Sequence, residues 1–197
     1  MTLAIGGFSE ALEVITSRAL VFLEASPAPI ILIDGRAGAG KSTFAKLLVD
    51  SLFRQGESMP RLIPMDELYP GWDLRGGSIY LEEKILLPIQ NRQTANWQIY
   101  DWESGHRGAP AEPGNGWREF DNATPLIIEG CGSISLRSAG IASLKIWIEA
   151  PLESRKVRFH DRDQGAFDDH WVSWQLQEDE FYELEGSPGL ADYQIQN

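Results

Sequence analysis

The sequence predicts an α/β fold in which helices cover a parallel sheet. Three observations carry this prediction: short apolar runs of strand length, helical stretches between most of them, and a length of 197 residues with 43% hydrophobic content. That length and content suit a single domain, residues 1–197, with a sizeable core. Alternation of strand and helix favours a doubly wound sheet with right-handed crossovers.

The first element is an expected helix between Ser9 and Leu23, with Ser9 placed to cap its first turn. Two prolines then end the helix, and the isoleucine-rich run "IILID" at residues 30–34 begins a strand. This run lacks polar alternation, which predicts burial on both faces. Four further runs predict strands, at residues 61–66, 125–131, 143–150 and, more weakly, 191–195.

The segment from about 94 to 124 departs from this rhythm. It contains "IYDWESGHRGAPAEPGNGW", which is dense in glycine, proline and aromatic residues. A long irregular insertion in a small domain is more often functional than idle. We expect a loop or hairpin on the substrate side of the domain.

Charge and composition exclude several classes of protein. The formal net charge of −12 opposes nucleic-acid binding, which depends on clustered lysine and arginine. No apolar run approaches the roughly 20 residues of a membrane span, and the first residues lack a signal-peptide pattern. We expect a cytoplasmic protein with no membrane partner. The single Cys131 excludes an internal disulfide and fits a buried small residue.

The pattern G-x-x-x-x-G-K-[ST] is complete between the first expected strand and a helix that continues as "FAKLLVDSLF". Small residues let consecutive backbone N–H groups converge on a phosphate, and the helix adds its positive end. Lys41 would reach the β and γ phosphates, and the Ser42 hydroxyl would ligate Mg²⁺. The residues expected to bind the nucleotide are Gly35, Arg36, Ala37, Gly38, Ala39, Gly40, Lys41, Ser42 and Thr43.

Three carboxylates follow apolar runs, where ligands lie in open α/β sheets. Asp66 is the candidate to accept a proton from an acceptor hydroxyl, its alternative role being to cap the next turn. Glu129 sits where an acid would hold Mg²⁺, usually through water, or would hydrogen-bond the glycine turn. Asp34 more simply serves the geometry of that turn.

Arg155, Arg158 and Arg162 are spaced three and four apart, so they share one face of a helix. Such a row could close over the nucleotide and stabilise charge on the transferred phosphoryl group. The alternative is a solvated helix face with salt bridges.

Aromatic residues give a weaker signal. Four of them flank acidic residues in loops and suit a planar or sugar-like substrate: Tyr69, Trp72, Tyr100 and Trp102. Four apolar residues at helical spacing are expected in the core: Trp171, Trp174, Leu176 and Phe181. His106 is interpreted as a surface residue.

Several motifs together resemble the uridine kinase and phosphoribulokinase-like branch of P-loop kinases, including its small bacterial members. In chain order they are "IDGRAGAGKST", "MDELYPGWD", "YDW", "LIIEG" and "RKVRFHDRD". The resemblance implies a three-layer P-loop NTPase fold with a five-stranded parallel sheet and a small helical lid at about 152–170. It also implies ATP and Mg²⁺ as cofactors.

By the same resemblance, Asp66 is the catalytic base with Tyr69 as its aromatic neighbour. Tyr100, Asp101 and Trp102 contact the acceptor, and the three arginines belong to the lid. "MDELY" has leucine where uridine kinases carry phenylalanine.

The leading hypothesis is an ATP-dependent kinase that phosphorylates a hydroxyl of a nucleoside-like small molecule. One alternative keeps the chemistry and changes the acceptor to a sugar, a vitamin precursor or a nucleotide monophosphate. Another is an ATP-binding module without phosphoryl transfer. The sequence lacks the Asn-Lys-x-Asp signature of guanine binding, and it leaves open whether the chain forms a homo-oligomer.

Overall fold

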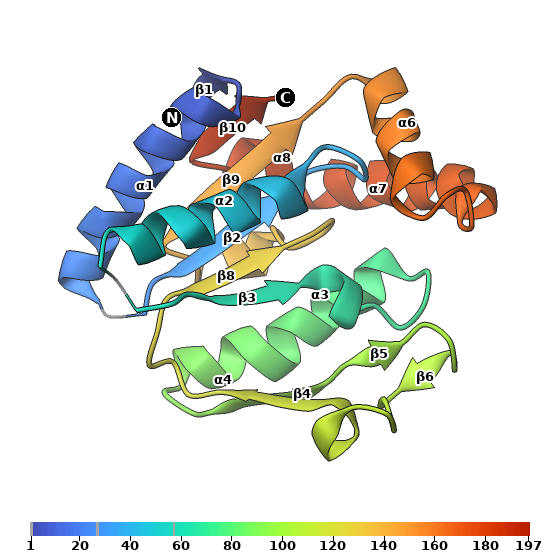
Figure 1. The fold of residues 1–197 in the computed structure, drawn as a ribbon, viewed down its shortest axis with the longest axis horizontal. Helices are drawn as coiled ribbons and strands as arrows, with labels where there is room; N and C mark the ends of the chain where they lie inside the picture. Colours follow the sequence, from blue (N-terminus) through green and yellow to red (C-terminus); the bar gives the residue numbers. More distant parts are fainter. Residues whose placement is uncertain (1, 27, 57) are drawn as a thin grey trace.

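The computed structural model describes residues 2–26, 28–56 and 58–197. A six-stranded sheet passes through the centre of the molecule in the order β1-β10-β9-β2-β8-β3 (Figure 1). All neighbouring strands in this sheet are parallel. Its strands are β1 (Leu3–Gly6), β2 (Ile30–Asp34), β3 (Arg61–Pro64), β8 (Leu126–Glu129), β9 (Leu144–Glu149) and β10 (Tyr193–Gln196). The predicted α/β class is confirmed, and all five expected strands are present.

The sixth strand, β1, is the difference from the expected five. It pairs with β10 from Leu3 opposite Tyr193 to Gly6 opposite Gln196, and it forms one edge of the sheet. Only Ile5 of β1 is buried. A short edge strand with one buried side chain has too little apolar pattern to stand out in a sequence.

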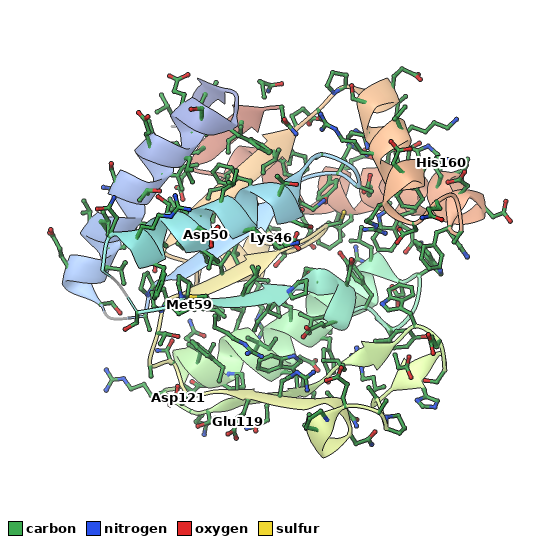
Figure 2. All side chains as sticks on the ribbon, viewed as in Figure 1. Lys46, Asp50, Met59, Glu119, Asp121 and His160 are labelled. Atoms are coloured by element: carbon green, nitrogen blue, oxygen red, sulfur yellow. The ribbon has the colours of Figure 1, made fainter. Side chains whose placement is uncertain are left out.

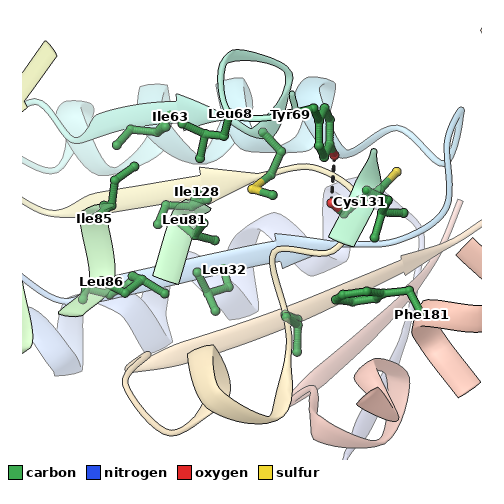
Figure 3. Close-up of a cluster of buried hydrophobic side chains, with 14 of the residues drawn as sticks. Leu32, Ile63, Leu68, Tyr69, Leu81, Ile85, Leu86, Ile128, Cys131 and Phe181 are labelled. Atoms are coloured by element: carbon green, nitrogen blue, oxygen red, sulfur yellow. Dashed lines mark hydrogen bonds between the residues drawn. The ribbon is translucent and has the colours of Figure 1, made fainter. Parts of the chain in front are cut away.

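Side chains of the central strand β2 alternate between two cores. Ile31 and Ile33 pack with α1 (Phe8–Ala25) and α2 (Lys41–Arg54), and this helix pair covers one face. Leu32 points to the other face, where α3 (Leu74–Leu81) and α7 (Trp171–Glu185) contribute to the core (Figure 3). Because a strand alternates its side chains, two covered faces favour apolar residues at consecutive positions, and residues 30–33 of β2 are all apolar.

The helix α1 begins one residue earlier than expected. Its N-cap is Gly7, and no side chain caps its first turn, so the prediction that Ser9 caps this helix is wrong. Gly7 has φ +77°, which β-carbon-bearing residues adopt rarely. The connection from β1 into α1 therefore relies on glycine backbone freedom in place of a side-chain cap.

Short helices and turns complete the layers. Helix α3 continues through the π-helical turn η2 into α4. Figure 1 shows this continuous helical segment beside β3. The remaining helical elements are η1 (Met65–Glu67), η2 (Glu82–Leu86), α4 (Leu87–Gln90), η3 (Pro113–Gly116), α5 (Leu136–Ala139), α6 (Leu152–Arg162), η4 (Asp168–His170) and α8 (Ser187–Leu190).

The insertion forms two antiparallel strand pairs, which agrees with the expected hairpin. The strand β4 (Ala95–Gln98) pairs with β7 (Trp117–Phe120). Between them, β5 (Tyr100–Asp101) pairs with β6 (His106–Arg107). Both pairs lie outside the six-stranded sheet; in Figure 1, β4 runs below α4, and β5 and β6 lie to the right.

The side chains expected in the core from residue 171 to 181 are mostly buried. Trp171, Trp174 and Phe181 are buried as predicted, but Leu176 is 64% exposed, because it lies on the solvent face of α7.

Among the residues described, no helix has both the length and the apolar character needed to cross a membrane.

Candidate functional site

The glycine-rich segment forms a turn between the end of β2 and the start of α2. β2 is buried along its whole length, and α2 begins at Lys41 directly after Gly40. The first amides of a helix lack intrahelical partners and carry partial positive charge. A cavity of about 700 Å³ opens at this point, and Lys41, Ser42 and Thr43 contribute to its lining. The turn therefore has the donors and the space that a phosphate needs.

Gly38 shows why the turn needs glycine. Its φ is +77°, and a β-carbon there would collide with the backbone carbonyl of Arg155 in α6. A side chain at this position would strain the loop and push α6 away. Close packing of α6 on the loop thus depends on the glycine at position 38, which the motif does not specify.

Lys41 is buried against the loop that precedes it. Its Nζ donates to the carbonyl of Arg36 at 3.0 Å and lies 3.3 Å from Sγ of Cys131. Burial acts to lower the pKa of Lys41, but Cys131, Glu129 and Glu178 outweigh it, and the pKa is raised. The lysine stays charged and can attract an anion into the cavity.

Glu129 ends β8 and lines the same cavity with Ser42. Burial raises its pKa, while the nearby Lys41 and a side-chain hydrogen bond with Ser42 lower it in part. A hydroxyl and a carboxylate side by side supply the oxygen ligands that Mg²⁺ prefers. Both roles expected for Glu129, holding a cation and bonding the loop, are compatible with this geometry.

Asp66 lies in η1, and its carboxylate lines the cavity. Oδ2 lies 3.6 Å from Nη1 of Arg162, and the side chain of Asp66 is 62% exposed. The indole N–H of Trp102 donates to the Asp66 backbone carbonyl at 3.0 Å. This bond connects the insertion to the turn that carries Asp66.

The three arginines of α6 do not share one role. Arg158 and Arg162 line the cavity, and Arg158 donates to the carbonyl of Gly38 at 3.3 Å. Arg155 is instead buried behind the loop, where it donates to the carbonyls of Ala150 at 3.2 Å and Ala37 at 3.4 Å. We expected all three arginines to face the nucleotide site, but only Arg158 and Arg162 line the cavity, because the side chain of Arg155 points into the core.

Aromatic side chains from several segments form the other wall of the cavity. They belong to the turn after η1, the insertion, the loop after α6 and helix α7: Tyr69, Trp72, Trp102, Phe167 and Trp174. Three of the five residues expected to bind the acceptor, Tyr69, Trp72 and Trp102, are among them.

The contacts of these rings limit what each can do. The Tyr69 hydroxyl donates to the Cys131 carbonyl at 2.8 Å, so its proton is already engaged (Figure 3). The ring of Trp72 stacks on His170 at 4.2 Å. Trp102 packs against Trp72 at 5.3 Å.

Tyr100 and Asp101, the other two expected acceptor residues, belong to β5 and lie outside the lining of this cavity. The ring of Tyr100 packs against Trp102 at 5.4 Å. The backbone N–H of Glu103 donates to Oδ1 of Asp101 at 3.0 Å, so this carboxylate closes the turn of the hairpin, and hydrogen bonds from Ser104 and Glu103 lower its pKa. In this arrangement Tyr100 supports the ring of Trp102, and neither Tyr100 nor Asp101 lines the cavity.

Asp34 confirms the expectation that it serves the turn. It is fully buried and accepts from the backbone N–H groups of Gly35 at 2.6 Å, Gly132 at 3.1 Å and Ile134 at 2.8 Å, and from the Tyr182 hydroxyl at 2.8 Å. Burial raises the pKa of Asp34 to about 6, although these hydrogen bonds lower it in part.

Two groups of the site gave no local signal in the sequence. Glu178 and Tyr182 stand in α7, more than a hundred positions after the loop they contact. Their spacing of four places them on one face of α7, but the same spacing fits any amphipathic helix.

A second hollow of about 550 Å³ lies at the amino end of β3, away from the glycine-rich turn. Met59, Glu119 and Asp121, labelled in Figure 2, contribute to its lining with Arg61. The hollow is separate from the residues that the motifs single out.

Comparisons with known proteins support the fold. A scan of protein-family models and a search of curated proteins give no match. Solved structures do match. A structure described as a possible uridine kinase, from Bacillus stearothermophilus, is 14% identical with a TM-score of 0.66, over 93% of this chain and 96% of that one.

Two further structures align over most of their length. A candidate fructose transport system kinase from Silicibacter sp. TM1040 is 19% identical with a TM-score of 0.56, over 93% of this chain and 98% of that one. D-glycerate 3-kinase from Cryptococcus neoformans var. grubii is 12% identical with a TM-score of 0.51, over 87% and 88%. The chain is therefore structurally similar to P-loop kinases of small molecules.

Proposed function

We propose that this protein is a P-loop kinase that transfers the γ-phosphoryl group of Mg-ATP to a hydroxyl of a nucleoside or nucleoside-like small molecule. One observation carries the proposal: the glycine-rich loop and Asp66 line the same cavity, whose far wall is aromatic. A nucleotide-binding module needs the loop but has no need of a carboxylate across from it.

The residues of the loop fit a magnesium nucleotide. The amides at the start of α2 and the charged Lys41 bind the phosphate oxygens, while Ser42 and Glu129 hold the cation directly or through water. When bound, Mg-ATP supplies the phosphoryl group and a leaving group whose charge is already partly neutralised. Lys41 and Arg158 then stabilise the charge that develops on the transferred oxygens.

Asp66 takes the proton of the attacking hydroxyl. Its carboxylate faces the cavity and is open to an acceptor. In this conformation it pairs with Arg162, so the acceptor hydroxyl would displace or share that pairing. Arg162 would then be released toward the phosphates. The helical segment from 152 to 170 acts in this proposal as the lid that excludes water.

The aromatic wall favours an uncharged acceptor with a planar or ring-shaped group. Trp102 and Phe167 have ring centroids 6.4 Å apart and come from the insertion and the lid. Arg162, the cation beside them, is already engaged by Asp66 at 3.6 Å and by Asp163 at 2.6 Å. A carboxylate or phosphate placed beside Arg162 would therefore meet the carboxylates of Asp66 and Asp163, whereas a nucleoside would stack on the rings.

The test is turnover on a panel of acceptors. ATP consumption and phosphorylated product are measured by mass spectrometry with nucleosides, nucleotide monophosphates, sugars and vitamin precursors. Asp66→Asn is expected to lower kcat by about 10²-fold or more, the usual contribution of a general base. Asp50→Asn is the matched control, because it makes the same charge change on the exposed side of α2 (Figure 2).

Each outcome separates the alternatives. A nucleoside product that disappears in Asp66→Asn supports the proposal, and a product only from another class of acceptor replaces the nucleoside with that class. Mg-ATP binding without turnover on any compound favours a binding module. Turnover that is equal in wild type and Asp66→Asn removes Asp66 from the chemistry.

A further inference from the structure

A buried carboxylate lies directly behind the phosphate-binding loop. Glu178, in the middle of α7, has 0% of its side chain exposed. Its Oε1 accepts from the backbone N–H of Ala37 at 2.6 Å and from the Cys131 thiol at 3.3 Å. A negative charge so close to an anion-binding loop opposes phosphate binding, so its presence requires a reason.

Two arginines compensate this charge. Oε2 of Glu178 lies 3.5 Å from Nη1 of Arg36 and 3.9 Å from Nη1 of Arg155. Among the described residues, this oxygen has no hydrogen-bond partner, so the compensation is Coulombic. Arg36 comes from the loop itself and Arg155 from α6. The cluster thus joins the loop, α6 and α7 in one buried charge network.

The network holds both peptide groups that flank the α-carbon of Ala37. Glu178 takes the N–H of Ala37, and Arg155 donates to its carbonyl at 3.4 Å. Because that N–H points at Glu178, it is unavailable to a phosphate. Of the amides that follow, that of Ala39 donates to the Arg36 carbonyl at 3.1 Å, so those of Gly38 and of Gly40 to Ser42 are left to converge on the ligand.

We infer that Glu178 is a positioning residue that, together with Arg155, fixes the peptide groups around Ala37 and so sets the loop in its phosphate-binding conformation. It touches no substrate in this role and acts through the backbone of the loop. The inference rests on the proposed function only where it concerns nucleotide affinity. The effect on loop geometry is independent of any acceptor or of turnover.

Three variants test this inference. Glu178→Gln keeps the size and an oxygen that can accept from Ala37 but loses the charge, and Glu178→Ala loses both. Asp179→Asn is the matched control, since Asp179 also pairs with Arg36, at 2.6 Å, but its side chain is 62% exposed. Two measurements are made on each full-length protein: residue-resolved amide hydrogen exchange without nucleotide, and the Kd for Mg-ATP by calorimetry.

The expected result is graded. Loss of a buried charged hydrogen bond makes the Ala37 amide exchange about tenfold faster in Glu178→Gln and faster still in Glu178→Ala. The Kd for Mg-ATP rises about tenfold in Glu178→Gln and stays within about twofold in Asp179→Asn. Amides of the central strand β2 keep their protection from exchange in Glu178→Gln and in Asp179→Asn. This result separates loop positioning from a general loss of stability.

Other results would overturn the inference. If Ala37 exchanges in Glu178→Gln as it does in Asp179→Asn, the carboxylate does not fix the loop. The same follows if β2 loses protection as much as Ala37, or if Mg-ATP binds with unchanged or higher affinity. If wild type binds no Mg-ATP, the proposed function fails, and the exchange measurement alone still decides whether Glu178 holds the loop.

Discussion

Tyr182→Phe removes the hydroxyl that ties α7 to the end of β2, and its shortest hydrogen bond is the one to Asp34. The hydroxyl of Tyr182 donates to Oδ1 of Asp34 at 2.8 Å, and both side chains are buried. Phenylalanine keeps the ring, which packs edge-on against Trp147 at 4.8 Å. The Gly132 N–H, which lies 3.2 Å from this hydroxyl, still has Asp34 as an acceptor at 3.1 Å.

The cost of this substitution should depend on pH. The pKa of folded Asp34 is about 6, against 3.8 for an exposed aspartate, so the folded protein holds more protons between these values. Its stability therefore falls as pH rises through that window, because ionisation of the buried acid is unfavourable. The Tyr182 hydroxyl stabilises the ionised form, so the loss of that hydroxyl matters most above pH 6.

A hydrogen bond to a charged group contributes about 2 kcal/mol and one to a neutral group about 1 kcal/mol. We expect Tyr182→Phe to reduce the free energy of unfolding by about 2 kcal/mol at pH 8 and by about 1 kcal/mol at pH 5. Urea unfolding followed by tryptophan fluorescence at both pH values measures the difference.

Tyr80→Phe is the control for this experiment. Its hydroxyl bonds to the backbone of Gln98, at 3.2 Å to the carbonyl and 3.0 Å from the N–H. Its cost should therefore be the same at pH 5 and pH 8. A cost of Tyr182→Phe that is equal at both pH values, or below about 0.5 kcal/mol at pH 8, would refute the role assigned to this bond.

Two further predictions concern the aromatic wall of the cavity and the helical segment from 152 to 170. Trp102→Ala should raise the KM of the acceptor about tenfold, because one stacking ring is lost, and should leave the KM of ATP near its wild-type value. Steady-state kinetics measures both constants. A change in the KM of ATP alone would contradict the prediction. Nδ1 of protonated His160 donates to Oδ2 of Asp168 at 2.7 Å, and this bond raises the pKa of His160 above 6.5. The stabilisation from the charged pair is therefore fully present below pH 6.5 and is lost as pH rises through the raised pKa. NMR titration should show this raised pKa and its return to the ordinary range in Asp168→Asn.

Much of the fold could be predicted from the sequence. The run "IILI" at residues 30–33 is apolar at every position because helices cover both faces of β2, and such a run is visible without a structure. The edge strand β1 could not be predicted, because only Ile5 is buried and its partner β10 lies at the other end of the chain. Strand pairing over that separation leaves no local pattern.

The place of the glycine-rich turn, between the end of β2 and the start of α2, was also predictable. Its chemistry depends on consecutive backbone amides and on a lysine and a serine at fixed positions, so the motif itself specifies the geometry. The role of Asp34 in the turn follows from its place at the end of β2, and the structure confirms it through bonds to Gly35 and Ile134.

The sequence by itself thus determined the α/β class, the places of the main strands along the chain and the glycine-rich loop that follows β2. Only the tertiary structure decided which side chains surround that loop. Arg155 and Arg158 are three residues apart, yet one is buried behind the loop and the other faces the cavity. Glu178 reaches Ala37 across 141 positions. Local motifs encode backbone conformation, whereas burial and partners are set by packing between distant elements, which no short segment contains.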